Sequence, residues 1–198
     1  VKDYMQNSAV KNFLAVKSFF KKLHNYASVL KIELSKGKDF VMPDYNVFPD
    51  YKTRKEIINE LCDRYKFIKH CFAGKSVCGR GIDVLHIGNT KNRVLYCGGF
   101  HGSEYLTILA LLKFFEECCE AMESDKTVGG CKIGNFLSIR GLTIVPCVNP
   151  DGTEIALHGS DAAFKYKPLV EKVCTDTYKW QANARGVDIN HNLSLIHI

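Results

Sequence analysis

Residues 98–104 read Gly98-Gly99-Phe100-His101-Gly102-Ser103-Glu104 and mark the point where an apolar run of strand-forming residues gives way to a helix. The run covers residues 93–97, and after the quoted stretch apolar side chains recur with helical spacing. The glycine pair breaks the strand, and Ser103 is placed to cap the helix. We therefore predict that His101 and Glu104 lie at the carboxyl end of a buried strand, where open α/β sheets bind ligands.

His101 and Glu104 have the chemistry of half a zinc site. Neutral imidazole nitrogen and carboxylate oxygen are both good Zn²⁺ ligands, and catalytic zinc sites usually combine three protein ligands with one open position. The spacing by itself is a weak indication, because the helix dipole favours a Glu in a first helical turn in any case. The pair therefore needs support from other segments, including a third ligand.

Composition limits the classes of protein that this chain can belong to. It has 198 residues, of which 46% are hydrophobic and 24% are charged, as expected for one globular domain. No apolar stretch approaches the roughly 20 residues of a membrane span. Nine cysteines without regular spacing favour a reduced, cytoplasmic protein, with an extracellular location as the alternative if the true N-terminus precedes Val1. The net charge of +6 is spread out, without the basic runs of proteins that bind nucleic acid, so we expect no nucleic-acid partner.

Strands and helices alternate along the chain, which favours a mixed, mainly parallel α/β sheet flanked by helices and incomplete at its C-terminus. Residues 74–81 are glycine-rich but lack the order of a phosphate loop, so a hairpin is the better interpretation. Asn149-Pro150-Asp151-Gly152 suits a type I turn, and residues 123–135 read as a loop. The sequence predicts helices at residues 53–65 and 103–122, and strands at residues 67–72, 82–87, 94–97, 142–148 and 186–190.

Residues 1–45 form a separate, basic N-terminal extension, predicted to be helical. Its apolar stripe near residues 10–31 favours packing against the rest of the domain. Two alternatives are a helix lying on a membrane surface and a translated upstream region preceding a true start at Met42. Binding to a membrane is the less favoured interpretation.

Three ordered segments resemble the zinc carboxypeptidase family, that is, the carboxypeptidase A-like metallopeptidases. The hairpin at residues 74–81 is also similar to an early strand pair of that family. The resemblance extends over about residues 51–192, and we assign residues 46–192 to the N-terminal part of a zinc peptidase domain. The three segments are Gly99-Phe100-His101-Gly102-Ser103-Glu104, Val148-Asn149-Pro150-Asp151-Gly152 and Asn183-Ala184-Arg185-Gly186-Val187-Asp188-Ile189-Asn190.

The resemblance implies a role for each matching residue. His101 and Glu104 match the first two ligands of a single zinc ion. Asp188 matches a carboxylate that accepts a hydrogen bond from the other ring nitrogen of the first ligand and so fixes its tautomer. Asn190 matches a residue that binds polar groups of the peptide substrate. Arg185 matches the arginine that polarises the scissile carbonyl and stabilises the oxyanion.

The residue after Asn190 departs from the carboxypeptidase pattern. Carboxypeptidases have an arginine there to grip the free carboxylate of the substrate, whereas this chain has His191. A mostly neutral imidazole does not replace a bidentate guanidinium, although His191 is still expected to contact substrate. Residues 179–190 resemble instead the γ-D-glutamyl-diamino acid endopeptidases, which cut bacterial cell-wall peptides. Strict exopeptidase activity is therefore less favoured.

The third ligand, a His, and the catalytic Glu of the family lie beyond the segment that ends at Asn190. Residues 193–198 read Leu-Ser-Leu-Ile-His-Ile, which matches the translation of a sequencing adapter, and we interpret them as read-through after a truncated natural sequence. His197 comes too early to be the third ligand. The expected function is zinc-assisted hydrolysis of peptide bonds, with this fragment inactive. Alternatives are a non-catalytic peptide-binding pseudo-enzyme and a membrane-surface protein.

Overall fold

The computed structural model describes residues 43–191. The predictions for the N-terminal helices and for the tail after Asn192 lie outside the described residues, and the proposed domain boundaries stay predictions. Among the described residues, no helix is both long enough and apolar enough to cross a membrane.

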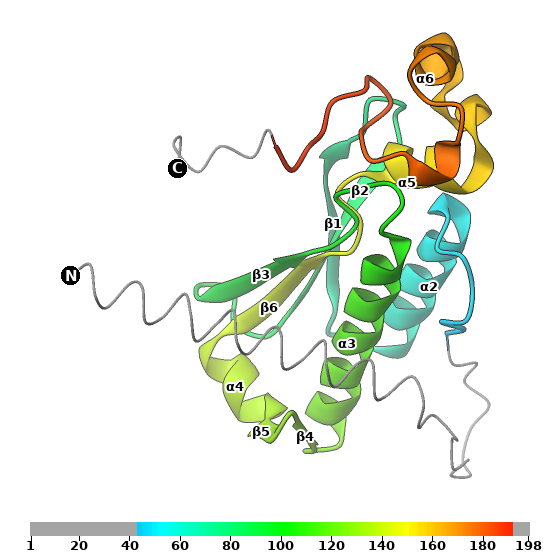
Figure 1. Ribbon diagram of the computed structural model, residues 1–198. Coiled ribbons are helices and arrows are strands. Elements are labelled where there is room, and N and C mark those ends of the chain that lie inside the picture. Colours follow the sequence, from blue (N-terminus) through cyan, green and yellow to red (C-terminus); the bar gives the residue numbers. More distant parts are fainter. Residues whose placement is uncertain (1–42, 192–198) are drawn as a thin grey trace. The chain divides into compact units, whose positions relative to one another are not determined.

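A four-stranded sheet forms the centre of the described fold (Figure 1). Its order is β1 (Lys69–Lys75), β2 (Gly81–Ile87), β6 (Gly141–Val145) and β3 (Arg93–Cys97). The β1–β2 and β2–β6 pairs are antiparallel, and the β3–β6 pair is parallel. The mixed α/β class is confirmed, but the expected parallel majority is not found within residues 43–191. One reason is that the short β1–β2 connection permits only antiparallel pairing.

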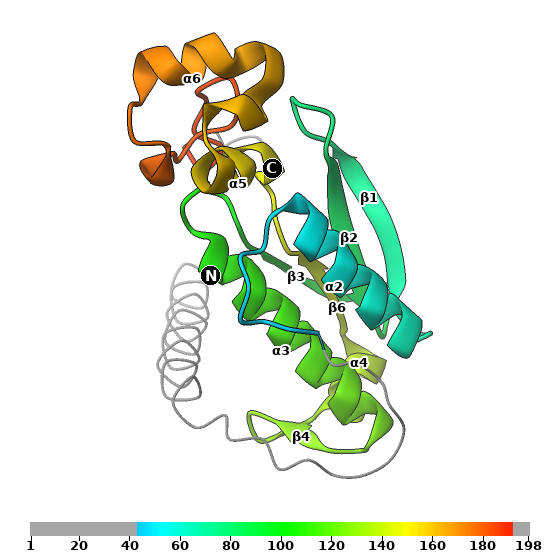
Figure 2. The same cartoon turned by 90° about the vertical axis from the view of Figure 1, so that its right-hand side faces the viewer.

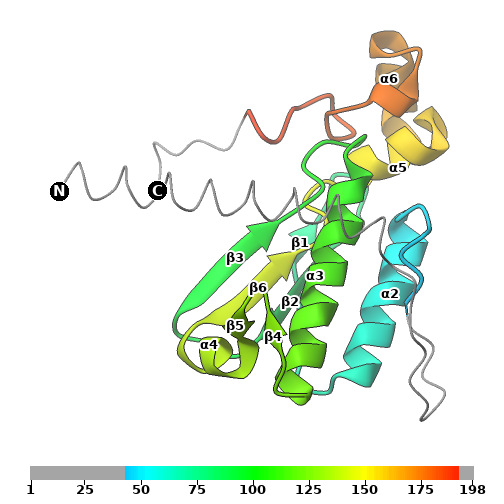
Figure 3. The same cartoon turned by 60° about the horizontal axis from the view of Figure 1, so that its bottom comes forward.

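Two long helices, α2 (Tyr51–Arg64) and α3 (Tyr105–Glu123), cover the same face of the sheet (Figures 2 and 3). α2 begins where Asp50 accepts a hydrogen bond from the backbone N–H of Thr53 at 2.8 Å. Apolar residues at helical spacing fill the space between both helices and the sheet. The fully buried members of this core include Ile58, Leu61, Leu85, Ile87, Ile108, Leu112, Phe115 and Ile144.

The segment predicted as a loop at residues 123–135 contains regular structure. A small hairpin joins β4 (Thr127–Val128) to β5 (Cys131–Lys132), and α4 (Ile133–Ile139) follows at once. Gly129 and Gly130 both have positive φ, as a tight two-residue hairpin turn requires. The prediction of a loop was wrong because the segment is mostly polar, and its two adjacent glycines form the turn of a hairpin.

The carboxyl ends of β3 and β6 point towards a second group of helices (Figure 1). It comprises α5 (Pro150–His158), the 3-10 helix η1 (Ser160–Tyr166), α6 (Lys167–Val173) and the 3-10 helix η2 (Thr177–Lys179). These elements and the segment after them share a separate apolar cluster. Its buried members are Ile155, Ala156, Ala163, Val170, Trp180 and Ala184.

Two further predictions at this end of the sheet were wrong. The expected type I turn at residues 149–152 is the start of α5, with Asn149 as the N-cap and Pro150 in the first turn. The expected strand at residues 186–190 is a loop. In that loop the Asn183 side chain accepts hydrogen bonds from the N–H groups of Arg185 and Val187. These local bonds compete with a strand ladder.

Candidate metal centre

His101 and Glu104 lie side by side in the loop between β3 and α3. Nδ1 of His101 is 3.0 Å from Oε1 of Glu104. The predicted capping role of Ser103 is wrong, because Glu104 occupies the N-cap position and makes no side-chain capping bond. The hydroxyl of Ser103 instead accepts a hydrogen bond from the side chain of Gln181. The Glu104 carboxylate is therefore directed to the imidazole rather than to the helix.

Asp188 faces the other ring nitrogen of His101. Its Oδ1 lies 3.5 Å from Nε2 of the imidazole, so the ring stands between two carboxylates. The hydrogen bond to Glu104 is the main cause that raises the pKa of His101. Asp188 is itself oriented by the backbone N–H groups of Asn190 at 2.9 Å and His191 at 3.2 Å. The hydrogen bond from the backbone N–H of His191 is the main cause that lowers the pKa of the Asp188 carboxyl.

The donor set fits two ligands of a zinc ion. Zinc bonds of about 2.1 Å in tetrahedral geometry place two ligand atoms about 3.4 Å apart, a few tenths of an ångström more than Nδ1 and Oε1 are here. Asp188 suits the role of orienting the imidazole through Nε2. Within residues 43–191, no group of three His, Cys, Asp or Glu side chains could hold a metal ion. His101 and Glu104 therefore form a two-ligand site that needs a further ligand.

The other predicted site residues lie in the same loop with different neighbours. Arg185 is exposed, and its guanidinium interacts with the phenol of Tyr166 and lowers the pKa of that phenol. Asn190 and His191 are also exposed, and Nε2 of His191 lies 3.8 Å from Oδ2 of Asp188. The structure thus brings His191 to the carboxylate that faces His101, and it places Arg185 beside Tyr166.

Two of the segments that carry the family resemblance, and the residues just before the third, meet around Gly102. Its N–H donates to the carbonyl of Gln181 at 3.3 Å. A Cβ atom at Gly102 would lie 2.3 Å from the carbonyl oxygen of Gly152 and 2.6 Å from that of Trp180. The loop of His101, the start of α5 and the segment after η2 are therefore in close contact, and the glycines serve as scaffold.

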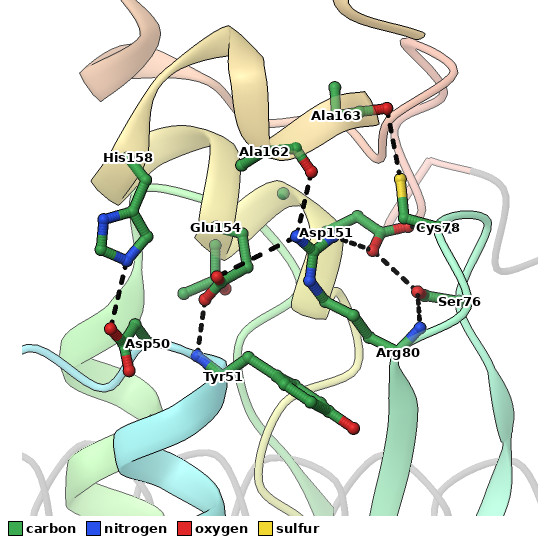
Figure 4. Close-up of polar contacts among 12 residues, drawn as sticks. Asp50, Tyr51, Ser76, Cys78, Arg80, Asp151, Glu154, His158, Ala162 and Ala163 are labelled. Carbon is green, nitrogen blue, oxygen red and sulfur yellow. Dashed lines mark hydrogen bonds and ion pairs between the residues drawn. The ribbon is translucent and has the colours of Figure 1, made fainter. Parts of the chain in front are cut away.

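Sequence reasoning missed Asp151, which joins the β1–β2 hairpin to α5 (Figure 4). Its carboxylate is 1% exposed. It accepts hydrogen bonds from Ser76 Oγ at 2.7 Å, the Cys78 N–H at 2.9 Å and Arg80 Nη1 at 2.7 Å. The sequence order Pro150-Asp151 is typical of the first turn of a helix, but no sequence pattern indicates that Asp151 binds the β1–β2 hairpin.

Two more contacts fix α5 against the start of α2 (Figure 4). Glu154 accepts a hydrogen bond from the N–H of Tyr51, and the His158 ring lies 3.2 Å from Asp50 Oδ2. The helix that carries Asp151 is therefore held from two sides, by the hairpin and by α2.

Comparison with known sequences shows the family of this chain. The profile described as zinc carboxypeptidase matches residues 54–195. The γ-D-glutamyl-L-diamino acid endopeptidase 1 of Lysinibacillus sphaericus is 31% identical over 144 residues, which are 71% of this chain and 36% of that protein. The uncharacterized protein YqgT of Bacillus subtilis (strain 168) is 30% identical over 149 residues, 73% of this chain and 39% of the relative. The chain thus spans less than two fifths of the length of these relatives.

Solved structures agree on the fold. The crystal structure of thrombin activatable fibrinolysis inhibitor superposes with a TM-score of 0.55 at 18% identity, over 74% of this chain and 32% of that one. At this identity the likeness concerns the fold alone. With the profile match over most of the chain and the His101–Glu104 pair in the loop after β3, the family assignment follows. This chain belongs to the zinc carboxypeptidase family.

Proposed function

We propose that this chain is part of a zinc-dependent peptidase domain in which Nδ1 of His101 and the carboxylate of Glu104 bind the metal. The observation that carries the proposal is the 3.0 Å approach of these two atoms in a member of this family. When bound, zinc acts as a Lewis acid and lowers the pKa of its water to about 7. The proposed reaction class is peptide-bond hydrolysis.

Three residues of this chain have proposed roles in metal binding and in stabilising the reaction. Asp188 accepts a hydrogen bond from the N–H at Nε2 of His101, which keeps the proton on Nε2, leaves the Nδ1 lone pair for the metal and makes the imidazole a better ligand. Glu104 adds a negative charge to the site. Arg185 is the cation proposed to face the negative charge that develops on the scissile carbonyl oxygen. Its exposed position beside Tyr166 leaves the guanidinium accessible to a substrate.

The proposed substrates are peptides of the bacterial cell-wall type. The similarity to a protein named γ-D-glutamyl-L-diamino acid endopeptidase supports this proposal. A second support is His191, which is exposed close to Asp188. A neutral imidazole cannot form the paired hydrogen bonds with which a guanidinium grips a free carboxylate. We therefore propose endopeptidase action ahead of removal of single C-terminal residues.

Zinc titration of the purified 198-residue chain, in competition with a chromophoric chelator, tests the metal site. We expect one weak site that is lost in His101→Ala and in Glu104→Ala, because each removes one of two ligands. Asp188→Asn should weaken binding by about 10–100-fold, since it disturbs the orientation of the imidazole. His158→Ala is the matched control, because this half-exposed His pairs with Asp50. Zinc binding unchanged by His101→Ala would contradict the proposal.

Activity requires a separate measurement. The 198-residue chain should be inactive towards a γ-D-glutamyl-diamino acid peptide because its described site holds only two ligands. A longer polypeptide, in which this chain is followed by the region that comes after the matched segment in the relatives, should cleave this peptide. His101→Ala should abolish the cleavage. The same polypeptide should act more slowly on a simple C-terminal exopeptidase substrate. Preference for the exopeptidase substrate would refute the proposed specificity.

A further inference from the structure

Asn149 joins the loop of His101 to the segment that leads to Asp188. Asn149 is 1% exposed, and its side-chain amide donates hydrogen bonds to the carbonyl of Phe100, just before His101, and to the carbonyl of Ala182. We propose that Asn149 is a positioning residue, which holds His101 in register with Asp188. The inference rests on the proposed binding of zinc by His101 and Glu104.

The first part of the argument is a ladder of hydrogen bonds that continues beyond the sheet. The N–H of Val148 donates to the carbonyl of Gly98, and the N–H of Asn149 donates to that of Gly99, each at 2.9 Å. The next residue, Pro150, has no N–H to donate. The Nδ2 of Asn149 takes its place and donates to the carbonyl of Phe100 at 3.0 Å. The side chain thus extends the ladder to the residue immediately before His101.

The second part of the argument is the contact between the loop of His101 and residues 180–182. Residues 180–182 run alongside its loop, because the Gly102 N–H donates to Gln181 and the Ser103 N–H donates to Trp180 at 3.1 Å. Nδ2 of Asn149 also donates to the carbonyl of Ala182 in this segment, at 3.1 Å. One amide group therefore fixes the backbone before His101 and the segment that leads to Asp188.

Burial makes these bonds hard to replace. The Asn149 side chain is 1% exposed, and loss of its donor removes one hydrogen bond from the carbonyl of Phe100 and one from that of Ala182. The capping function of Asn149 is separate, because it uses the other atom: Oδ1 accepts from the Gly152 N–H at 2.9 Å. Substitution can therefore remove the donor and keep the cap.

Two variants make this separation. Asn149→Asp preserves the shape and the capping oxygen, since Asp and Asn cap helices about equally well, but above neutral pH its carboxylate cannot donate. Asn149→Ser keeps a capping hydroxyl without introducing a buried charge, and it provides the test if Asn149→Asp does not fold. The matched control is Asp151→Asn, two residues along in the same helical turn, whose bonds go to the hairpin and not to the His101 loop.

Zinc affinity and amide exchange are measured on the 198-residue chain. We expect the zinc dissociation constant of both Asn149 variants to rise at least about tenfold, as for other groups that orient a ligand. Hydrogen exchange at the Gly102 and Ser103 amides, measured without metal, should accelerate. Asp151→Asn should lower the midpoint of thermal unfolding and leave zinc affinity and these two exchange rates near those of the wild type.

The outcomes separate the two proposals. A wild-type chain that binds no zinc would refute the metal site itself, and exchange at Gly102 and Ser103 would still decide whether Asn149 holds the loop. Wild-type zinc affinity in both Asn149 variants would overturn the positioning role. An equal loss of affinity in Asp151→Asn would also overturn it, because a general loss of stability would then explain the effect.

Discussion

Gly102 leaves almost no space between the loop of His101 and α5. The atoms that a Cβ would meet are the backbone oxygens of Gly152 and Trp180, at 2.3 Å and 2.6 Å. Backbone atoms cannot move aside as the end of a side chain can. A single methyl group at this position would therefore separate the segments that carry His101 and Asp188.

We predict that Gly102→Ala lowers the free energy of unfolding by about 1–3 kcal/mol or more, the usual effect of forcing extra volume into a packed site. Gly134→Ala is the control, because Gly134 lies in α4 with no atom within 4 Å of the added Cβ. That substitution should stabilise the chain by about 0.5–1 kcal/mol, since Ala restricts the unfolded chain and favours helix. Denaturant unfolding measures both, and equal effects of the two substitutions would contradict the packing argument.

The apolar sequence of β3 is typical of a buried strand, but several side chains of β3 are exposed. Its run of apolar residues predicted a buried strand, and the central strand β6 beside it is almost wholly buried. In β3, however, Leu95 is 59% exposed and Tyr96 is 42% exposed. No strand among residues 43–191 pairs with its outer edge. Parallel strands are normally covered on both faces, and an uncovered apolar edge can pair with another chain.

We predict that the 198-residue chain self-associates as its concentration rises and that Leu95→Lys suppresses this association, because a charge on an edge strand opposes pairing. Val173→Lys is the matched control, since Val173 is 64% exposed but belongs to α6 rather than to the sheet. Sedimentation velocity over a range of concentrations measures both. Equal suppression by the two substitutions would indicate general solubility rather than edge pairing.

For the molecule as a whole, periodicity in the sequence predicted the long elements well. The helices expected at residues 53–65 and 103–122 and the strands expected at 82–87 and 94–97 are present, with ends shifted by a few residues. The helices repeat apolar residues at helical spacing, and the strands are short apolar runs rich in strand-forming residues. Short or polar elements, such as the β4–β5 hairpin and α4, carry too few apolar residues for such a pattern.

The candidate site was predictable in its residue types and less so in its geometry. The order of the three segments pointed to His101, Glu104 and Asp188, which the structure brings together. Asn149 was taken for part of a turn, although Asn followed by Pro is also a helix-start signal. Its contacts to Phe100 and Ala182 join segments 49 and 33 residues away in the chain. No local pattern indicates such distant partners.

The amino-acid sequence alone indicated which side chains have the chemistry of metal ligands and where the long helices and strands form, because ligand chemistry and local apolar patterns are properties of neighbouring residues. The tertiary structure alone decided that Asp188 faces His101, that Asp151 holds the hairpin and that Asn149 supplies the hydrogen bond that Pro150 cannot donate. Those choices depend on which backbone groups are left unpaired after the sheet and helices pack, and packing brings together residues that are far apart in the sequence.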